Sequence, residues 1–357
     1  MRYIIFISMT LLFSSCQKKS TPPTPSETAY ILQHDGLPKP DLPKDNPLTQ
    51  SGIKLGRMLF YETELSKDNS ISCASCHDQK NAFSDTNQFS IGVKGLPGKR
   101  QAMAVFNMAW NNNEFFWDGR AELLRHQSLM PIEDPLEMDE TLEQVVIKLQ
   151  KRSDYQWWFK KAFPDTPEIN SLNISLALEQ FMYSIVSNQS KYDQYLRNEV
   201  RFTASEERGR YLYFTAYNPS NPSKSGANCA MCHGGANFEN DSYMNNGLDD
   251  ESDIKDPGRK AVTNFSLDHG KFKVPSLRNI ELTPPYMHDG RFNTLEEVIA
   301  HYNNGIKISS TTSLTLTSIQ QNGGLHLSVQ DQKDLVAFLK TLTDSKLLAN
   351  PEYASPF

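Results

Sequence analysis

Two copies of one pattern, Cys-x-x-Cys-His, constrain this chain more than any other feature of its sequence. The first copy covers residues 73–77 and the second covers residues 229–233, 156 positions later (229 − 73). Two cysteines at this spacing can form thioether bonds to the vinyl groups of one porphyrin, and the adjacent histidine then reaches an axial position of the iron. The sequence therefore predicts two covalently bound c-type haems. The residues that would hold them are Cys73, Cys76, His77, Cys229, Cys232 and His233.

Other sites also use Cys-x-x-Cys pairs, notably zinc ribbons and thioredoxin-like dithiols. A zinc ribbon would bring its two pairs within roughly 15–20 residues of each other, and neither alternative explains why a histidine follows both pairs. The chain has five cysteines, and only Cys16 lies outside the two motifs. No cysteines remain for a disulfide framework, so haem attachment is the favoured interpretation.

The N-terminus predicts export. An apolar run from Tyr3 to Phe13 is too short to cross a bilayer as a permanent helix and is typical of a secretory signal. The following Ser14-Ser15-Cys16 resembles the lipobox of bacterial lipoproteins, so we expect residues 1–15 to be a signal peptide and Cys16 to become lipidated. This predicts a periplasmic protein anchored through lipid to the cell envelope. Gln17 replaces the Asp that tends to retain lipoproteins at the inner membrane, which favours the outer membrane.

Length and hydrophobic periodicity predict two helical domains. A chain of 357 residues suggests about two domains of roughly 150 residues each. Residues 16–45 are polar and rich in Pro, Ser and Thr, which predicts a flexible tether. Apolar residues recur at helical spacing in residues 52–61, 141–152, 171–188, 205–217, 294–302 and 328–341. The predicted fold is mostly α, a tandem of two cytochrome c-like haem domains covering residues 46–200 and 201–347.

Three local features complete this prediction. Asp118 is expected to cap a helix over residues 121–129. The aromatic cluster at residues 157–159 predicts core packing rather than a second redox site. The net charge of −6, from 36 basic and 42 acidic side chains, gives no basic face for nucleic acid.

Four further motifs lie in order between and after the two haem motifs. They are Phe-Trp-Asp-Gly-Arg at residues 116–120, Asp-Pro-Leu-Glu-Met at 134–138, Lys-Val-Pro-Ser-Leu-Arg-Asn at 273–279 and Pro-Tyr-Met-His-Asp-Gly at 285–290. With them, residues 47–342 resemble the bacterial di-haem cytochrome c peroxidases, a family that includes the methylamine-utilisation enzyme MauG. The resemblance implies that hydrogen peroxide reacts at the N-terminal haem. It also implies that the C-terminal haem relays electrons from a small periplasmic donor protein.

The resemblance assigns roles to individual residues. His77 and His233 match the proximal iron ligands, and Trp117 matches the tryptophan between the haems. Glu137 matches the catalytic glutamate, and Gln127 matches the glutamine that helps to hold bound peroxide. One carboxylate beside an open iron can accept a proton from peroxide and then deliver it to the leaving oxygen. From the residues alone, Glu137 among its acidic neighbours would be a solvated carboxylate, and Trp117 would be packing.

Two departures from the family pattern bear on the subtype. Peroxidases that need prior reduction carry a histidine in the loop after the first haem motif, but no histidine occurs here between His77 and His126. The resemblance thus implies a first iron with a vacant position, with His126 as the alternative ligand. At the second haem, Tyr302 stands where the family usually has methionine, as in MauG. A phenolate would lower the potential that a thioether raises, and Met287 and His301 are the rival ligands.

The resemblance further implies a calcium ion between the haems, held by Thr283, Pro285 and, in place of the family's asparagine, Gln101. It also implies a homodimer. The leading hypothesis is a peroxidase that needs no reductive activation. The alternatives are a MauG-like oxidase that acts on a protein or organic substrate through high-valent iron, and a non-enzymatic electron carrier or redox sensor.

Overall fold

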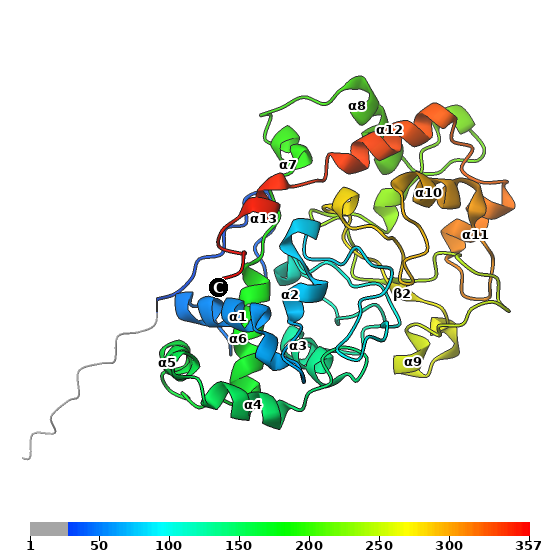
Figure 1. The fold of residues 1–357 in the computed structure, drawn as a ribbon. Coiled ribbons are helices and arrows are strands. Elements are labelled where there is room, and N and C mark those ends of the chain that lie inside the picture. The colour runs from blue at the N-terminus through cyan, green and yellow to red at the C-terminus, as the bar shows by residue number, and fades with distance from the viewer. Residues whose placement is uncertain (1–27) are drawn as a thin grey trace, which may run out of the picture.

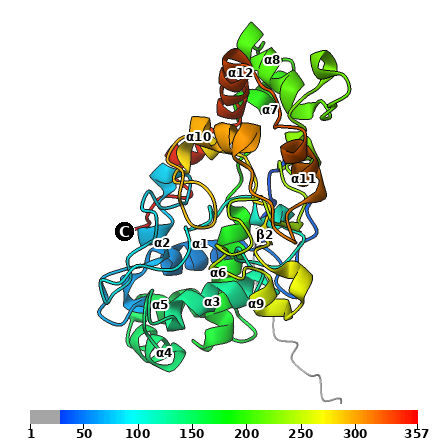
Figure 2. The same cartoon turned by 90° about the vertical axis from the view of Figure 1, so that its right-hand side faces the viewer.

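The computed structural model describes residues 28–357, so the predicted signal peptide and Cys16 lie outside the described residues. The described chain is mostly helical, and its one sheet is the antiparallel pair of β1 (Tyr243–Met244) and β2 (Phe272–Lys273). Figures 1 and 2 show the chain from two sides. The helices are α1 (Gln50–Tyr61), α2 (Cys73–Cys76), α3 (Leu124–Glu133), α4 (Leu142–Gln150), α5 (Ser153–Ala162), α6 (Ser171–Ser184), α7 (Lys191–Leu196), α8 (Ala204–Phe214), α9 (Lys260–Thr263), α10 (Leu295–Ala300), α11 (Leu314–Gln321), α12 (Val329–Lys340) and α13 (Ser345–Ala349).

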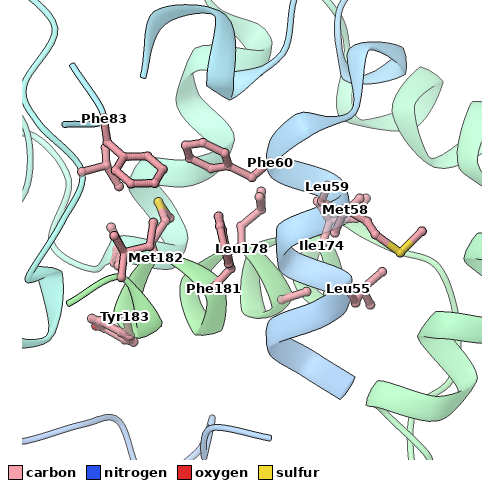
Figure 3. Packing of buried hydrophobic residues seen from close by; sticks show 14 of the residues in the cluster. Leu55, Met58, Leu59, Phe60, Phe83, Ile174, Leu178, Phe181, Met182 and Tyr183 are labelled. Atoms are coloured by element: carbon pink, nitrogen blue, oxygen red, sulfur yellow. The ribbon is translucent and has the colours of Figure 1, made fainter. Parts of the chain in front are cut away.

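The first hydrophobic cluster forms where α1 packs against α6 (Figure 3). The Thr49 side chain caps α1 by accepting a hydrogen bond from the Gly52 amide. Leu55, Leu59 and Phe60 are fully buried, and each such side chain contributes roughly 1.5–3 kcal/mol through removal of apolar surface from water. The Phe60 ring meets Phe181 of α6 edge to face, with centroids 5.3 Å apart. Cys73 of the first motif borders this cluster.

The second hydrophobic cluster forms where α8 packs against α12. The Thr203 side chain and Glu206 make a reciprocal capping box at the start of α8. Tyr213 of α8 and Phe338 of α12 are fully buried, with ring centroids 5.0 Å apart. Cys229 of the second motif borders this cluster. Each Cys-x-x-Cys-His motif thus follows a helix that is buried against a later helix of its own cluster.

The chain crosses between the clusters near both predicted domain ends. Tyr192 of α7 packs into the second cluster, whereas Leu347 and Tyr353 return to the first. The Asp344 carboxylate accepts the backbone amides of Asn188 and Gln189 at the crossing. These contacts tie the C-terminal end of the chain to its first half.

Residues 28–45 do not form the flexible tether that their composition predicted. Leu32 and Leu37 are buried in the first cluster, and the Trp110 indole Nε1 donates to the Pro38 carbonyl at 2.6 Å. Asp45 pairs with Arg125 at 2.7 Å. The prediction was wrong here because a few apolar residues suffice to hold an extended segment against a core.

Other local predictions also need correction. Asp118 does not cap a helix, because α3 begins only at Leu124 and the Asp118 carboxylate pairs with Arg100 at 2.6 Å. Helix α6 ends at Ser184 rather than at residue 188. In the aromatic cluster Phe159 is buried as predicted, but Trp157 is 54% exposed. Within residues 28–357, no helix is both long enough and apolar enough to cross a membrane.

Candidate haem sites and the residues between them

The first motif places its histidine for iron ligation. Cys73 and Cys76 form the short helix α2, and neither is in a disulfide. The His77 Nδ1 atom lies 3.1 Å from the Phe83 carbonyl oxygen. Because a carbonyl oxygen can only accept, Nδ1 carries the proton and Nε2 keeps its lone pair, which is the arrangement of a histidine metal ligand. Burial also lowers the pKa of His77, so the neutral form is retained.

The second motif repeats this arrangement with a different partner. The His233 Nδ1 atom lies 3.0 Å from the Pro275 carbonyl oxygen, and burial lowers the pKa of His233 to about 4. The Tyr213 hydroxyl of α8 donates to the His233 carbonyl. Buried, neutral imidazoles whose Nδ1 atoms face backbone carbonyls at both motifs are what two haem sites require.

A cavity of about 270 Å³ opens beside the second motif. Cys229, Cys232 and His233 lie in its wall, together with Tyr302 and Met287. The remaining wall is mainly apolar and includes Ile299, Leu316, Leu325, Leu335 and Leu339. An apolar cavity with both attachment thiols, a neutral imidazole and further donor groups fits a c-type haem.

The three candidates for the sixth ligand of the second iron lie differently. Tyr302 and Met287 line the cavity, whereas the buried His301 directs Nε2 to the Asn246 carbonyl at 3.1 Å. The Asn246 amide donates to the Met287 Sδ at 3.2 Å and also hydrogen-bonds the Tyr302 hydroxyl. Burial raises the pKa of Tyr302 to about 12, against the effect of that hydrogen bond. The geometry favours Tyr302 and Met287 over His301.

Glu137 lies beside the first motif. Burial is the main cause of the raised thiol pKa values of Cys73 and Cys76, and the nearby Glu137 charge adds to it at both. Burial, reinforced by Asp134 and opposed by Arg120, raises the pKa of the Glu137 carboxyl to about 7. Its backbone is fixed by a hydrogen bond from the Val93 amide to the Glu137 carbonyl at 2.9 Å. A carboxyl with this pKa exchanges protons readily near neutral pH.

The other residues predicted near the first haem lie on α3. Gln127 is partly buried, and no hydrogen bond within the described part of the chain joins it to Glu137. His126 is exposed to solvent on the same helix. An exposed His126 does not favour its assignment as a ligand, and the role of Gln127 stays a prediction.

Trp117 lies between the two halves. Its indole Nε1 donates to the Gln101 carbonyl at 2.8 Å, and its own carbonyl accepts the Lys273 amide at 2.7 Å. The Gln101 side chain donates to the Ser84 hydroxyl at 3.0 Å, next to the Phe83 carbonyl that holds His77. Trp117 also lines the cavity of the second motif. A chain of direct contacts therefore leads from the first histidine to the second cavity.

The three residues predicted to hold calcium also meet at this cavity. Gln101, Thr283 and Pro285 all line its wall. Within residues 28–357, no group of three or more His, Cys, Asp or Glu residues could hold a metal ion. Amide and backbone oxygens would have to supply the ligands, and calcium binding stays a prediction.

Sequence reasoning missed Asn246, which contacts both remaining ligand candidates. It lies in a long polar stretch with many Asn residues, so nothing in the pattern distinguishes it. The histidine partners Phe83 and Pro275 were missed as well, because both act through backbone carbonyls, which carry no sequence signal.

Comparison with known proteins decides the family. The sequence profile of the di-haem cytochrome c peroxidases matches residues 50–201. The methylamine utilization protein MauG of Methylorubrum extorquens is 34% identical over 84% of this chain and 80% of its own length. The chain belongs to the di-haem cytochrome c peroxidase family. The cytochrome c551 peroxidase of Nitrosomonas europaea, another relative in this family, is 34% identical over 85% of this chain and 82% of its own length.

Solved structures agree with this di-haem family. A crystal structure of a MauG-like protein associated with microbial copper homeostasis covers 91% of this chain and 98% of its own, with 34% identity and a TM-score of 0.81. The di-haem peroxidase BthA of Burkholderia thailandensis shares the fold, with a TM-score of 0.69 at 21% identity over 94% of this chain and 98% of its own. Membership of the di-haem family implies two c-type haems per chain, a peroxide substrate and an electron donor.

Proposed function

We propose that this protein is a di-haem cytochrome c peroxidase that reduces hydrogen peroxide to water with electrons from a small periplasmic donor protein, without prior reductive activation. The observation that carries the proposal is Glu137, whose carboxyl has a pKa raised to about 7 beside the first haem motif. The overall reaction consumes one peroxide, two protons and two electrons and yields two waters. It therefore needs a group that moves protons at the first site.

Glu137 is suited to that task in both directions. With a pKa near 7, its carboxylate can take a proton from peroxide and its carboxylic acid can then deliver the proton to the leaving oxygen. A bound haem would supply the iron that binds peroxide and exchanges electrons with it. His77 would hold that iron through Nε2, because its Nδ1 donates a hydrogen bond to the Phe83 carbonyl.

The two clusters support a division of labour within the chain. We assign one haem domain to each hydrophobic cluster and its motif, with peroxide at the first and electron entry at the second. Trp117 is the contact between them, through Gln101 on one side and the second cavity on the other. The absence of histidine between His77 and His126 supports a first iron that is open in the oxidised protein.

A second candidate function is a MauG-like oxidase of a protein or organic substrate. Tyr302 in the second cavity favours it, because the resemblance places a tyrosine at this position in MauG. The two functions differ in what sustains turnover. The peroxidase consumes peroxide with a reduced donor alone, whereas the oxidase stalls until its own substrate is supplied.

The deciding experiment combines spectroscopy with turnover. The as-isolated oxidised holoprotein should show a high-spin electron paramagnetic resonance signal that disappears when peroxide is added. It should also consume peroxide steadily with a reduced small c-type cytochrome. An all-low-spin spectrum, with activity only after one-electron reduction, would contradict activation-free turnover.

We further propose that the protein is exported, lipidated at Cys16 and held in the periplasm at the cell envelope, with the outer membrane favoured. The apolar run and lipobox-like residues at the N-terminus support this location. Calcium at Gln101, Thr283 and Pro285 and assembly as a homodimer also remain proposals. Intact mass of membrane-extracted protein tests the lipid directly.

A further inference from the structure

The outer face of α5 exposes two adjacent tryptophans. Trp157 is 54% exposed and Trp158 is partly exposed, whereas Trp110 in the first cluster is only 6% exposed. The opposite face of α5 is conventional, with Tyr155, Phe159 and Ala162 buried. Trp158 packs in part against the first cluster, so the exposed ring of Trp157 and the open side of Trp158 form the surface. Indole surface left in water is unfavourable, which indicates that this surface is covered in the functional state.

Lysines surround these rings. The Lys161 Nζ lies 5.0 Å from the Trp157 ring centroid and 5.4 Å from that of Trp158. The Lys54 Nζ of α1 lies 4.6 Å from the Trp158 centroid, and Lys160 is exposed beside them. The two rings meet edge to face at 4.6 Å. We call these five residues the tryptophan–lysine patch: Lys54, Trp157, Trp158, Lys160 and Lys161.

Local charge at the patch is opposite to the charge of the whole chain. The net charge is −6, yet the patch contains three lysines and no acidic residue. The nearest acidic residue within α5, Asp154, is engaged by Arg152 at 2.8 Å. Asp165 is exposed beyond the end of α5. Aromatic rings beside amines are the combination that membrane interfaces favour, because indoles insert among headgroups and amines pair with anionic phosphates.

The patch lies where the chain enters the described fold. The Thr28 carbonyl accepts the Gln50 amide at the start of α1, and Lys54 is one helical turn further along. Helix α5 lies next to α1 and at the opposite end of the molecule from α8 and α12 (Figures 1 and 2). Cys16 precedes Thr28 by 12 residues (28 − 16), which span at most ~40 Å when extended. A lipid on Cys16 would therefore leave this face within reach of a bilayer.

We propose that the tryptophan–lysine patch is a membrane-contact surface that docks the protein on anionic phospholipid headgroups. The inference uses the proposed envelope location but does not depend on the haem chemistry. Docking there would leave the other end of the molecule facing away from the bilayer. The second cavity, which is lined by Leu335 and Leu339 of α12, would then stay accessible to a soluble electron donor.

The test separates the patch from the lipid. Holoprotein in which a cleavable secretory signal replaces residues 1–16, so that both the apolar run and the lipid are absent, is mixed with vesicles of phosphatidylglycerol and phosphatidylethanolamine in equal parts. The bound fraction is measured by sedimentation. We expect binding that weakens with added salt and is absent on phosphatidylcholine vesicles. Trp157→Ala/Trp158→Ala should reduce the bound fraction at least about fivefold, because the inserting rings are lost. Lys160→Glu/Lys161→Glu should do the same through charge.

Matched controls fix the interpretation. Phe265→Ala removes an aromatic ring that is also 54% exposed, and Lys224→Glu/Lys333→Glu reverses two exposed lysines elsewhere. Both should bind like the parent, and haem content by pyridine haemochrome should be unchanged in all variants.

Binding that is absent in the parent, or equal in the tryptophan variant, would overturn the proposal. A dimer in sedimentation velocity that only the patch variants lose, without vesicle binding, would overturn it in favour of a contact between two copies. Intact mass of the wild-type protein reports the lipid separately.

Discussion

Both halves of this molecule pack a glycine of one helix against the backbone of a later helix, but different residues surround the haem motif in each half. In the first half, a Cβ added to Gly56 of α1 would lie 1.9 Å from the Ala177 carbonyl oxygen of α6. In the second, a Cβ added to Gly209 of α8 would lie 1.9 Å from the Asp334 carbonyl oxygen of α12. In both cases a phenylalanine four residues further along the partner helix packs against the glycine. The close helix crossing before each Cys-x-x-Cys-His motif is therefore the repeated unit.

The halves differ in what surrounds the motif. The His77 imidazole is held by the carbonyl of Phe83, six residues on (83 − 77), whereas His233 is held by Pro275, 42 residues on. The first motif has the titratable carboxyl of Glu137 beside it. The second has a cavity lined by Tyr302 and Met287. A shared scaffold fixes the motif, and residues contributed by later loops give each motif different surroundings, which the proposed function assigns to proton transfer at the first and electron relay at the second.

The largest effect is expected at Glu137, the titratable carboxyl that lies beside the first motif and not beside the second. Glu137→Gln keeps the shape of the side chain but cannot move a proton, so peroxide turnover should fall by roughly 10²–10⁴. Both haems should remain bound, and the high-spin signal of the oxidised protein should persist. Glu133→Gln changes an exposed carboxyl on α3 and should leave turnover unchanged. Near wild-type turnover of Glu137→Gln would mean that the buried Glu137 carboxyl takes no part in the reaction.

The pH dependence should follow the same group. The proposed proton transfer requires the Glu137 carboxylate, so turnover should decrease about tenfold for each pH unit below the pKa of about 7. The folded state binds this proton more tightly than the unfolded state, whose carboxyl has the ordinary value of 4.5. The free energy of unfolding should therefore decrease as the pH rises from 4.5 to about 7. Glu137→Gln should remove this contribution, which thermal unfolding at both ends of the window will show.

The shared helix crossing predicts equal costs in the two halves. Gly56→Ala and Gly209→Ala should each destabilise the protein by roughly 1–3 kcal/mol or more, because the added methyl group meets partner backbone rather than a flexible side chain. Gly98→Ala is the matched control, since its new Cβ would have only an ordinary contact at 3.6 Å. Thermal unfolding of the holoproteins measures the difference. A large cost at only one glycine would refute the repeated packing.

The motifs, the helix bearing Gly56 and the helices Leu295–Ala300 and Val329–Lys340 could all be predicted, because each depends on residues close together in sequence. The family resemblance singled out Glu137 and Trp117. The raised pKa of Glu137 could not be predicted, since it depends on burial set by the tertiary fold.

Long-range contacts explain the remaining failures. Asp118 has the right residue type and spacing for a helix cap, but Arg100 and Arg120 engage its carboxylate instead. Aromatic residues predict burial, yet only one face of α5 meets the core, and this leaves Trp157 exposed. Periodicity predicts the spacing of apolar residues along a helix. It does not predict which other helix will pack against them and bury them.

Smaller effects are expected at the second cavity, with opposite signs for two neighbours. Tyr302→Phe removes a phenolate donor and should raise the potential of the second haem. Asn246→Ala removes a hydrogen bond that stabilises the phenolate, so it should lower the potential by an amount equivalent to about 1 kcal/mol or less of free energy. Spectroelectrochemistry measures both, and the high-spin signal of the first haem should not change. Met287→Leu is the control: a large change there would make methionine the ligand in place of Tyr302.

The smallest change in stability is expected at Trp117, at the junction of the halves. The most specific change in kinetics is expected there too. Trp117→Phe removes the hydrogen bond to the Gln101 carbonyl, a loss of roughly 0.5–1.5 kcal/mol, and leaves an aromatic ring in place. Trp110→Phe removes a comparable bond to the Pro38 carbonyl within the first cluster, so the two variants should lose similar stability.

Of these two tryptophans, only Trp117 lines the second cavity, where its indole bonds the Gln101 carbonyl beside Ser84. Rapid mixing with peroxide should therefore show normal reaction at the first haem in both variants, but slower oxidation of the second haem in Trp117→Phe alone. Equal rates in the two variants would make Trp117 a packing residue, and the connection between the halves would then have to run through other contacts. A slower second phase in Trp117→Phe with unchanged phases in Trp110→Phe would instead show that this indole couples two otherwise similar halves.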